Sequence, residues 1–355
     1  MSLDDLREGI DKTDTEIVRL IAERIRISRK IGEEKLEKGR QVRDPVREKR
    51  VLAQVKQLAQ QAHVNEDDIE AIYRQIITAS ASVQGIIVAF QGEIGAYSEE
   101  AAFRHFGNSI HVKPCENLDD VFAMVERGEV TTGIVPVENS LEGSISRTYD
   151  LLLDSSLKVS GEAELRVIHC LIANPGATLA SIKTVYSHPQ ALGQCQRFLK
   201  HLGRQLVPTY DTAGSVKMIK EKGIIDGAAI ASTRAAAIYG MNIIAREIED
   251  NPNNFTRFFV LGKQDSPPTG NDKTSIVFSV KHRPGALYEL LNELAGRKVN
   301  LTKIESRPTR QKPWEYNFYL DFEGHREEQG AREAIQAIQE FALFVKVLGS
   351  YPKAK

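Results

Sequence analysis

Through residues 4–84, apolar positions recur every three or four residues, without the strict alternation of a half-buried strand. A first helix is expected from about Leu3 to Glu37, with Gly39 behind it as a C-terminal signal. The pair Asp44-Pro45 supplies an N-cap and a first-turn proline, which predicts the start of a second helix. A third helix is expected from about Asn65 to Gln84. The chain should therefore begin with an all-helical segment.

The pattern changes at Ile86. Short apolar runs now end in polar, glycine-containing turns that open helices, as in IIVAFQG, GIVPVENS, VYSHPQ and AAIASTRAA. This is typical of an α/β domain. The segment GKQDSPPTGND, residues 262–272, is rich in Pro, Gly and Asp and predicts a linker. The runs that follow it predict a βαββαβ unit of ferredoxin-like topology.

One face of the first predicted helix mixes apolar residues with cations. Ile17, Leu20, Arg24, Ile31 and Lys35 fall on the same side of a helical wheel. Desolvating an unpaired ammonium or guanidinium costs several kcal/mol. A buried face of this kind therefore needs a partner anion or a ligand.

The other two helices add polar residues to the same interior. On the third helix, Ser80 and Gln84 continue the inward face with hydrogen-bonding groups one turn apart. The second helix brings Asp44, Arg47 and Glu48 to its first turns. The set fits a pocket for a small dianion. The alternative is a structural hairpin whose inward cations pair with Asp44 or Glu48.

The size of this helical segment favours association. Residues 4–84 are few for a stable monomer, and the first helix is too long to pack fully against two shorter neighbours. We expect dimerisation through the first helix.

These residues resemble the active-site pattern of the all-helical chorismate mutases, including VRD followed by Arg-Glu. The resemblance covers residues 1–84 and implies an intertwined dimer in which Arg7 reaches into the partner's site. Rearranging chorismate to prephenate involves no proton transfer, so the site needs only to hold the folded conformer and stabilise charge. The resemblance implies Arg7, Arg24 and Arg47 for the substrate carboxylates, Lys35 and Gln84 for the ether oxygen, Asp44 and Glu48 for the hydroxyl-bearing side, and Ser80 in support.

Several turns between residues 86 and 262 combine small and polar residues before a predicted helix. The first is Gly92-Glu-Ile-Gly95-Ala-Tyr97-Ser98, and comparable turns begin at Glu138, Ser187, Thr212 and Ser232. Each turn alone is more often a plain helix cap. Several helix N-termini aimed at one cleft would cradle an anionic ligand. Their repetition in two halves suggests two lobes around a cleft.

The stretches VPVENSLEGSI, YSHPQALGQC and NNFTRFFVLGK resemble prephenate dehydratase over about residues 86–262. The resemblance implies a bilobal fold like that of periplasmic solute-binding proteins. A threonine hydroxyl is a poor acid near neutral pH, so we interpret Thr256 as a positioned hydrogen-bond donor. The proton source stays open, with Glu138 as one hypothesis. Arg257 is either a ligand for a substrate carboxylate or a structural ion pair. The implied site residues are Thr256, Glu138, Asn139, Ser187 and Gln194.

The last segment contains two short motifs, Pro284-Gly285-Ala286-Leu287-Tyr288 and Glu305-Ser306-Arg307-Pro308. They resemble the ACT domain of prephenate dehydratases over about residues 273–352. Gly285 lets backbone approach a ligand closely, although Pro284-Gly285 is also simply a good helix start. The resemblance implies paired domains that bind phenylalanine at their interface. Inhibition then requires that the inactive arrangement binds phenylalanine more tightly. The implied regulatory residues are Gly285, Ala286, Leu287, Tyr288, Glu305, Ser306, Arg307 and Pro308.

Composition and charge narrow the alternatives. The 355 residues, of which 41% are hydrophobic, suffice for two or three domains. Net charge is −1, and residues 1–84 carry 16 Lys and Arg against 16 Asp and Glu, which argues against nucleic-acid binding. Three cysteines without CxxC spacing indicate neither disulfides nor zinc, and we expect no metal and no cofactor. A charged beginning and the lack of a long apolar run predict a cytoplasmic protein without a membrane segment.

The three resemblances together predict a bifunctional chorismate mutase–prephenate dehydratase with a phenylalanine-sensing domain. The expected domains are an all-α unit at 1–84, a bilobal α/β unit at 85–264 and an α+β ferredoxin-like unit at 272–355. Chorismate, prephenate and L-phenylalanine are the expected small molecules, and a homodimer or higher homo-oligomer is the expected assembly. A non-catalytic sensor of small anions or amino acids is the alternative, but Thr256 has no necessary role in it. A transcription regulator conflicts with the zero net charge of residues 1–84.

Overall fold

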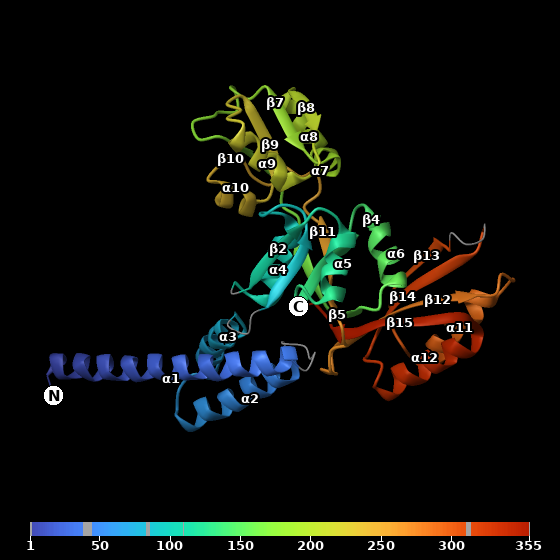
Figure 1. Cartoon of the computed structure of the whole chain (residues 1–355), viewed down its shortest axis with the longest axis horizontal. Coiled ribbons are helices and arrows are strands. Elements are labelled where there is room, and N and C mark those ends of the chain that lie inside the picture. Colours follow the sequence, from blue (N-terminus) through green and yellow to red (C-terminus); the bar gives the residue numbers. More distant parts are fainter. Residues whose placement is uncertain (1, 38–44, 83–85, 109, 310–313, 355) are drawn as a thin grey trace. The chain divides into compact units, whose positions relative to one another are not determined.

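The computed structural model describes residues 2–37, 45–82, 86–108, 110–309 and 314–354 (Figure 1). The chain forms two compact units. One comprises Met1–Ile87 with Phe106–His111, and the other comprises Val88–His105 with Val112–Lys355. The first unit is helical, and the second holds three β-sheets. The expected combination of an all-α part, a two-lobed α/β part and an α+β part is confirmed.

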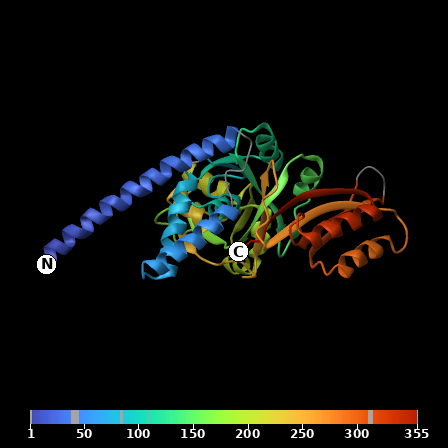
Figure 2. The same ribbon diagram turned by 90° about the horizontal axis from the view of Figure 1, so that it is seen from below.

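The helical unit consists of α1 (Leu3–Glu37), α2 (Pro45–Gln61) and α3 (Glu66–Ser82), close to the expected bounds. Asn65 caps α3, because its Oδ1 accepts hydrogen bonds from the amides of Asp67 at 2.9 Å and Asp68 at 3.2 Å. In both views the N-terminal half of α1 extends beyond α2 and α3 (Figures 1 and 2). Among the described residues of this unit, no other helix therefore lies along that half of α1.

The first lobe is built on a sheet with the order β2-β1-β3-β11-β5, to which β4 adds beside β3. Strand β11 lies antiparallel between β3 and β5, although its residues come from the far end of this part of the chain. Phe90, Ile134, Phe258 and Phe259 are fully buried in this lobe. Its elements are β1 (Ile87–Gln91), α4 (Tyr97–Phe106), β2 (His111–Cys115), α5 (Leu118–Arg127), β3 (Thr132–Asn139), β4 (Gly143–Ser144), α6 (Ser146–Asp154), β5 (Lys158–Arg166) and β11 (Phe255–Gly262).

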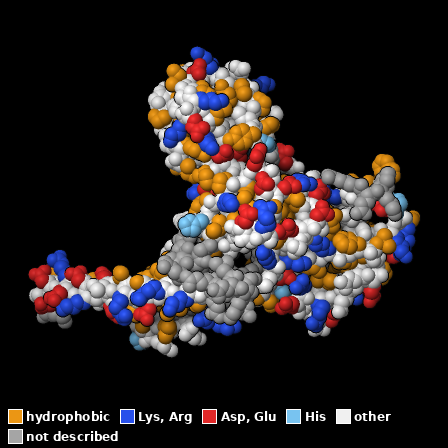
Figure 3. Space-filling view, in the orientation of Figure 1, with side chains coloured by type: hydrophobic (Ala, Val, Ile, Leu, Met, Phe, Trp, Pro, Cys, Tyr) orange, Lys and Arg blue, Asp and Glu red, His pale blue; other side chains and the backbone are white. Residues whose placement is uncertain are grey.

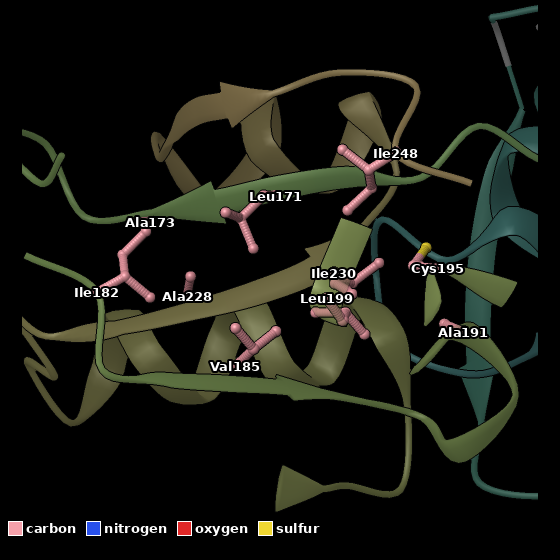
Figure 4. Close-up of a cluster of buried hydrophobic side chains, with 10 residues drawn as sticks. All are labelled: Leu171, Ala173, Ile182, Val185, Ala191, Cys195, Leu199, Ala228, Ile230 and Ile248. Atoms are coloured by element: carbon pink, nitrogen blue, oxygen red, sulfur yellow. The ribbon is translucent and has the colours of Figure 1, made fainter. Parts of the chain in front are cut away.

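The second lobe has the sheet order β10-β6-β9-β7-β8. Every residue of the strand GAAIA is buried, as expected for a central strand covered on both faces. Leu171, Val185, Leu199 and Ile230 belong to its core (Figure 4). The lobe comprises β6 (Cys170–Ala173), β7 (Thr184–Ser187), α7 (Pro189–Gln194), α8 (Gln196–Leu202), β8 (Gln205–Pro208), α9 (Thr212–Glu221), β9 (Gly227–Ala231), α10 (Thr233–Tyr239) and β10 (Asn242–Ala245).

The C-terminal domain has the predicted βαββαβ order and the sheet order β13-β14-β12-β15. Helices α11 and α12 cover one face of this sheet (Figures 1 and 2) and pack through Leu290, Leu294 and Ile338. Its elements are β12 (Asp272–Val280), α11 (Ala286–Gly296), β13 (Leu301–Pro308), β14 (Tyr316–Glu323), α12 (Gln329–Phe341) and β15 (Ala342–Pro352).

The C-terminal sheet meets the first lobe at close range. A Cβ added to Gly349 of β15 would collide with the backbone of Val159 in β5. The Tyr149 and Tyr319 rings stack edge to face with centroids 4.7 Å apart. The segment 262–272, predicted as a linker, is held against this contact, since Ser266 is buried and donates to the Ser160 carbonyl at 2.6 Å. Its composition indicated irregular backbone but could not indicate burial.

Candidate functional site

The register of two antiparallel strands places Asn139 opposite Thr256 and Glu138 opposite Arg257. Successive side chains of a strand point to opposite faces of the sheet. Asn139 and Thr256 share one face, where Asn139 Nδ2 lies 3.0 Å from Thr256 Oγ1. The neighbouring pair, Glu138 and Arg257, therefore faces away from them.

A chain of buried amides extends from this pair toward the second lobe. Asn139 Nδ2 donates to Asn254 Oδ1 at 2.7 Å, and Asn254 Nδ2 donates to Gln194 Oε1 at 2.8 Å. His169 Nε2 lies 2.9 Å from the same Gln194 oxygen, and Tyr97 Oη lies 2.9 Å from His169 Nδ1. Gln194 ends α7 in the second lobe, whereas Asn139 and Tyr97 belong to the first lobe. The network thus links groups from both lobes.

Hydrogen-bond roles fix the protonation of the histidine. In this arrangement Gln194 Oε1 can only accept, so His169 Nε2 carries a proton. Burial lowers the pKa of the His169 imidazole, although its hydrogen bond with Gln194 opposes the shift. The ring is therefore neutral near pH 7. The single hydrogen of the Tyr97 hydroxyl is shared between two acceptors, the Ile168 carbonyl oxygen at 2.8 Å and His169 Nδ1 at 2.9 Å. Burial also raises the pKa of Tyr97, which keeps the phenol protonated.

Asn139 also organises the turn that follows β3. Its Oδ1 accepts from the amides of Leu141 at 3.0 Å and Glu142 at 3.1 Å. The exposed Glu142 side chain approaches the network, because its Oε1 lies 3.4 Å from Gln194 Nε2. Ser187 is near in sequence to the network but buried elsewhere, since its hydroxyl donates to the Ile230 carbonyl at 2.7 Å.

The structure brings three of the predicted residues together, namely Asn139, Gln194 and Thr256. It adds Tyr97, His169 and Asn254, which the sequence analysis did not select. Asn254 stands two residues before Thr256 and Tyr97 lies in the glycine-containing turn, so both had a local signal. His169 had none, because only the folded chain brings it to Gln194, 25 residues further along the sequence.

Arg257 is engaged away from the amide network. Its Nε lies 2.8 Å from Glu162 Oε2, its Nη1 lies 2.6 Å from Asp321 Oδ2 and its Nη2 lies 3.0 Å from Tyr351 Oη. Its side chain is only 11% exposed. Glu138 pairs with Lys303, with Nζ 2.8 Å from Oε1. The geometry favours the ion-pair interpretation of Arg257. It also separates Glu138 from the Thr256 face, which removes geometric support for Glu138 as the proton source.

In the helical unit, Arg24 joins α1 to α3. Its Nη1 bonds to Ser80 Oγ and lies 3.4 Å from the Ile76 carbonyl oxygen. Arg47 and Glu48 lie at the start of α2. The side chain of Lys35, and the whole of Asp44 and Gln84, lie outside the described residues.

Arg7 lies far from Arg24 on the same helix. The two are 17 positions apart, which at about 1.5 Å per residue separates them by roughly 25 Å. Arg7 is exposed and lies 3.5 Å from Asp4. The two arginines therefore cannot contact one small ligand from a single copy of α1.

The two C-terminal motifs occupy different positions. Gly285 has a φ of 82° at the start of α11, a conformation that favours glycine, with Ala286 buried and Tyr288 72% exposed behind it. Along β13, Ser306 and Pro308 are exposed. Glu305 and Arg307 instead contact the first lobe, at Ser144 and at Asp150 respectively.

Acidic and basic side chains are interspersed over the face shown in Figure 3. Within the part of the chain that the structure describes, no helix is long and apolar enough to span a membrane. The same residues contain no cluster of three His, Cys, Asp or Glu side chains that could hold a metal ion.

Comparison with known proteins gives matches for all three parts. Family models match type II chorismate mutase at residues 6–85, prephenate dehydratase at 88–266 and the ACT domain at 274–340. The bifunctional chorismate mutase/prephenate dehydratase of Aquifex aeolicus (strain VF5) is 41% identical over 359 residues, covering 99% of this chain and 98% of the relative.

Two solved structures resemble the part of the chain after the helices. Prephenate dehydratase from Arthrobacter aurescens, in complex with L-Phe, is 32% identical with a TM-score of 0.70, covering 75% of this chain and 90% of that one. GqqA, described as a novel type of quorum quenching acylase, is 35% identical with a TM-score of 0.70, covering 75% of this chain and 98% of that one.

Proposed function

The chain belongs to the family of bifunctional chorismate mutase/prephenate dehydratases with a C-terminal ACT domain, and from this premise we propose how its residues divide the work. The protein rearranges chorismate to prephenate, converts prephenate to phenylpyruvate with loss of CO2 and water, and is feedback-inhibited by L-phenylalanine at the ACT domain. The near-full-length match to the Aquifex enzyme carries this conclusion. We assign residues 1–84 to the mutase, 85–264 to the dehydratase and 272–355 to the ACT domain.

The mutase reaction needs charge placement rather than proton transfer. Arginine forks suit the two carboxylates of chorismate, and a lysine ammonium suits the ether oxygen that gains charge as the C–O bond breaks. The bond between Arg24 and Ser80 supports this arrangement, because it fixes the guanidinium between two helices. The proposed residues are Arg7, Arg24 and Arg47 for carboxylates, Lys35 and Gln84 for the ether oxygen, Asp44 and Glu48 for the ring hydroxyl, and Ser80 to orient Arg24.

We assign Arg7 to the mutase site of a second copy of the chain. Its distance from Arg24 supports this, since one copy cannot supply both groups to one chorismate. A mutase site would then contain residues from two chains, and dimerisation would be a condition of activity.

The surface of α1 supports the same dimer. Its apolar residues recur at alternating intervals of three and four residues. Thr13 and Arg24 occupy the two positions of this repeat that are not apolar. Within one chain these side chains are 43% to 63% exposed. Such a stripe is typical of a helix that packs against another helix. The residues of the stripe are Leu3, Leu6, Ile10, Ile17, Leu20, Ile27 and Ile31.

In the dehydratase, Thr256 assists loss of the ring hydroxyl. When CO2 is lost, the electrons of the broken C–C bond enter the ring. The ring becomes aromatic as its hydroxyl leaves as hydroxide, and the hydroxide takes up one proton to form water. Because the Asn139 amide nitrogen can donate but not accept, the contact between them leaves the Thr256 hydrogen free. That hydrogen can be directed at the leaving oxygen, which gains charge as the C–O bond breaks.

The amide network positions this pair and the substrate. Asn254 and His169 both donate to Gln194 Oε1, so the Gln194 NH2 group is turned away from them. One of its hydrogens faces Glu142 Oε1, with Nε2 3.4 Å from that oxygen, and the other can be directed at an oxygen of the substrate. The resemblance implies Glu138, Asn139, Ser187 and Gln194 for the site, and Arg257 is the further candidate ligand for a substrate carboxylate. We place Asn139 and Gln194 at the substrate and give Glu138 and Arg257 a supporting position behind the strand.

Phenylalanine binding is assigned to the two ACT motifs. The positive φ of Gly285 and the exposure of Ser306 support an accessible ligand site next to backbone. The proposed residues are Gly285, Ala286, Leu287, Tyr288, Glu305, Ser306, Arg307 and Pro308, in an assembly of two or more chains. The three cysteines are free and buried, and free thiols are typical of a reducing compartment, so we assign the enzyme to the cytoplasm.

The acylase activity ascribed to GqqA is not assigned to this chain. A threonine nucleophile needs an adjacent base. Among the described residues, the side chain hydrogen-bonded to Thr256 is the Asn139 amide, which cannot take up a proton.

One experiment tests both activities and their regulation. The purified full chain receives chorismate alone, and chorismate, prephenate and phenylpyruvate are followed with and without L-phenylalanine. Phenylpyruvate formation that phenylalanine suppresses is the expected result. Accumulation of prephenate would contradict the role of Thr256. Untouched chorismate would contradict the mutase assignment and favour a non-catalytic sensor of small anions.

A further inference from the structure

Strand β13 of the ACT domain presents alternate side chains to the dehydratase domain. Lys303 Nζ lies 2.8 Å from both Glu138 Oε1 and Ser144 Oγ. Glu305 contacts the same serine, and Arg307 Nη2 lies 3.0 Å from Asp150 Oδ1. Residues 304, 306 and 308, which lie between and beyond them, are exposed. The strand that carries the second effector motif therefore also contacts the catalytic domain.

A second, more deeply buried contact surrounds Arg257. Its ion pairs join Glu162 of the dehydratase and Asp321 of the ACT domain, whose side chains are 0% and 6% exposed. Ser275 Oγ donates to the other oxygen of Asp321 at 2.5 Å. A buried charge that loses its partner is costly, so these groups must move together.

Both contacts end beside the catalytic pair. Glu138 precedes Asn139 on β3, and Arg257 follows Thr256 on β11. Adjacent residues share a planar peptide, and their Cα atoms stay about 3.8 Å apart. A displacement of the backbone at Glu138 or Arg257 is therefore shared by Asn139 or Thr256, whose side chains lie on the other face of the sheet.

We propose that Glu138 and Arg257 are positioning residues, through which Lys303 and Asp321 of the ACT domain set the geometry of Asn139 and Thr256. This inference rests on the proposed roles of Thr256 and of the phenylalanine site. Binding of phenylalanine beside exposed Ser306 shifts β13. Lys303, three residues away on the same strand, carries that shift to Glu138.

Linkage supplies a readout that a purely structural contact would not change. If phenylalanine and substrate favour different arrangements of these ion pairs, each weakens the binding of the other by the same factor. Removing one of these ion pairs should bring the coupling factor between phenylalanine and substrate toward one. It need not abolish the binding of either ligand.

The test uses the full chain carrying Lys303→Met. Phenylalanine binding is measured by calorimetry with and without a non-reacting prephenate analogue, and prephenate turnover is measured against phenylalanine concentration. In the wild type the analogue should weaken phenylalanine binding by about 5- to 150-fold. In Lys303→Met that ratio should fall toward one, and more phenylalanine should be needed for half-inhibition. Lys303→Arg, which keeps the cation, should retain most of the coupling.

Matched variants separate coupling from folding. Arg332→Met removes an exposed cation from α12 of the same domain and should keep the wild-type ratio. Asp321→Asn removes the charge facing Arg257 and should lower the ratio as Lys303→Met does. If Lys303→Met does not fold, the coupling ratio is measured in Asp321→Asn instead.

Two outcomes would overturn the inference or its premise. A wild-type ratio in both folded variants, Lys303→Met and Asp321→Asn, would overturn the positioning role. If the wild type itself neither binds phenylalanine nor is inhibited by it, the proposed regulation fails instead, and the variants are not needed to show it.

Discussion

Asn139 and Thr256 face each other across β3 and β11, with Asn139 Nδ2 3.0 Å from Thr256 Oγ1. The contact is backed by buried Asn254, whose Oδ1 accepts from the same amide at 2.7 Å. A hydroxyl held in this way is oriented before the substrate arrives. Preorganised donors of this kind lower a barrier because they need no reorganisation during the reaction.

Thr256→Val should abolish most prephenate turnover while leaving chorismate consumption intact. Valine keeps the shape but removes the hydroxyl, and loss of one preorganised donor typically costs about 10²- to 10³-fold in kcat. Thr256→Ser should retain most of the activity. Both reactions can be followed in one sample by quantifying prephenate and phenylpyruvate. Equal dehydratase rates for Val and wild type would exclude Thr256 from the reaction.

His169→Phe should make the folding stability depend less on pH between pH 7.5 and 5.5. Burial depresses the folded pKa of His169 below its ordinary 6.5, so the unfolded chain takes up this proton first as pH falls. The stabilisation from the neutral ring is present above about pH 6.5 and is lost as pH falls toward the folded value. The denaturation midpoint of the wild type should therefore drop more than that of His169→Phe between pH 7.5 and 5.5. Parallel profiles would contradict a buried neutral histidine.

Mixing two inactive variants should restore mutase activity. Arg7→Ala and Arg24→Ala each remove one carboxylate ligand, so each homodimer should be inactive. After subunit exchange, a heterodimer holds one doubly altered site and one intact site, and an equal mixture should recover about a quarter of wild-type activity. Chorismate loss is the measurement. No recovery despite proven exchange would place both arginines in a site formed by one chain.

Gly349→Ala should destabilise the unit formed by the dehydratase and ACT domains. The added methyl would collide with the Val159 backbone, and overpacking of this kind costs about 1–3 kcal/mol or more. Gly330→Ala is the matched control, because Gly330 lies in α12 with open space around it. That change should be neutral or stabilising by up to about 1 kcal/mol, since alanine favours helix. Thermal unfolding of both variants measures the difference.

Much of the fold was predictable from local signals. The helix bounds at Leu3, Glu37 and Pro45 follow from spacing and from residues that start or stop helices, and they are confirmed. The βαββαβ order after residue 271 is confirmed as well. These features depend on nearest neighbours along the chain, which a sequence pattern reports directly.

The candidate site was only partly predictable. The motif around Glu138 and Asn139 marked both residues as the start of a turn, whereas in the structure they end strand β3 and face opposite sides of the sheet. It could not say which side faced the second lobe, because that depends on the pairing of β3 with β11. His169 could not be found at all, since its partner Gln194 lies 25 residues away, at the end of α7.

The sequence alone determined the order of three domains, their secondary structure and the chemical types gathered in each site. Spacing and turn residues encode these properties locally. Only the tertiary structure decided that Asn139, Asn254, Gln194 and His169 form one buried network, and that Arg257 faces the ACT domain instead of Thr256. The reason is physical: burial and ion pairing join residues whose separation along the chain carries no pattern, and they exist only once the sheets have closed on one another.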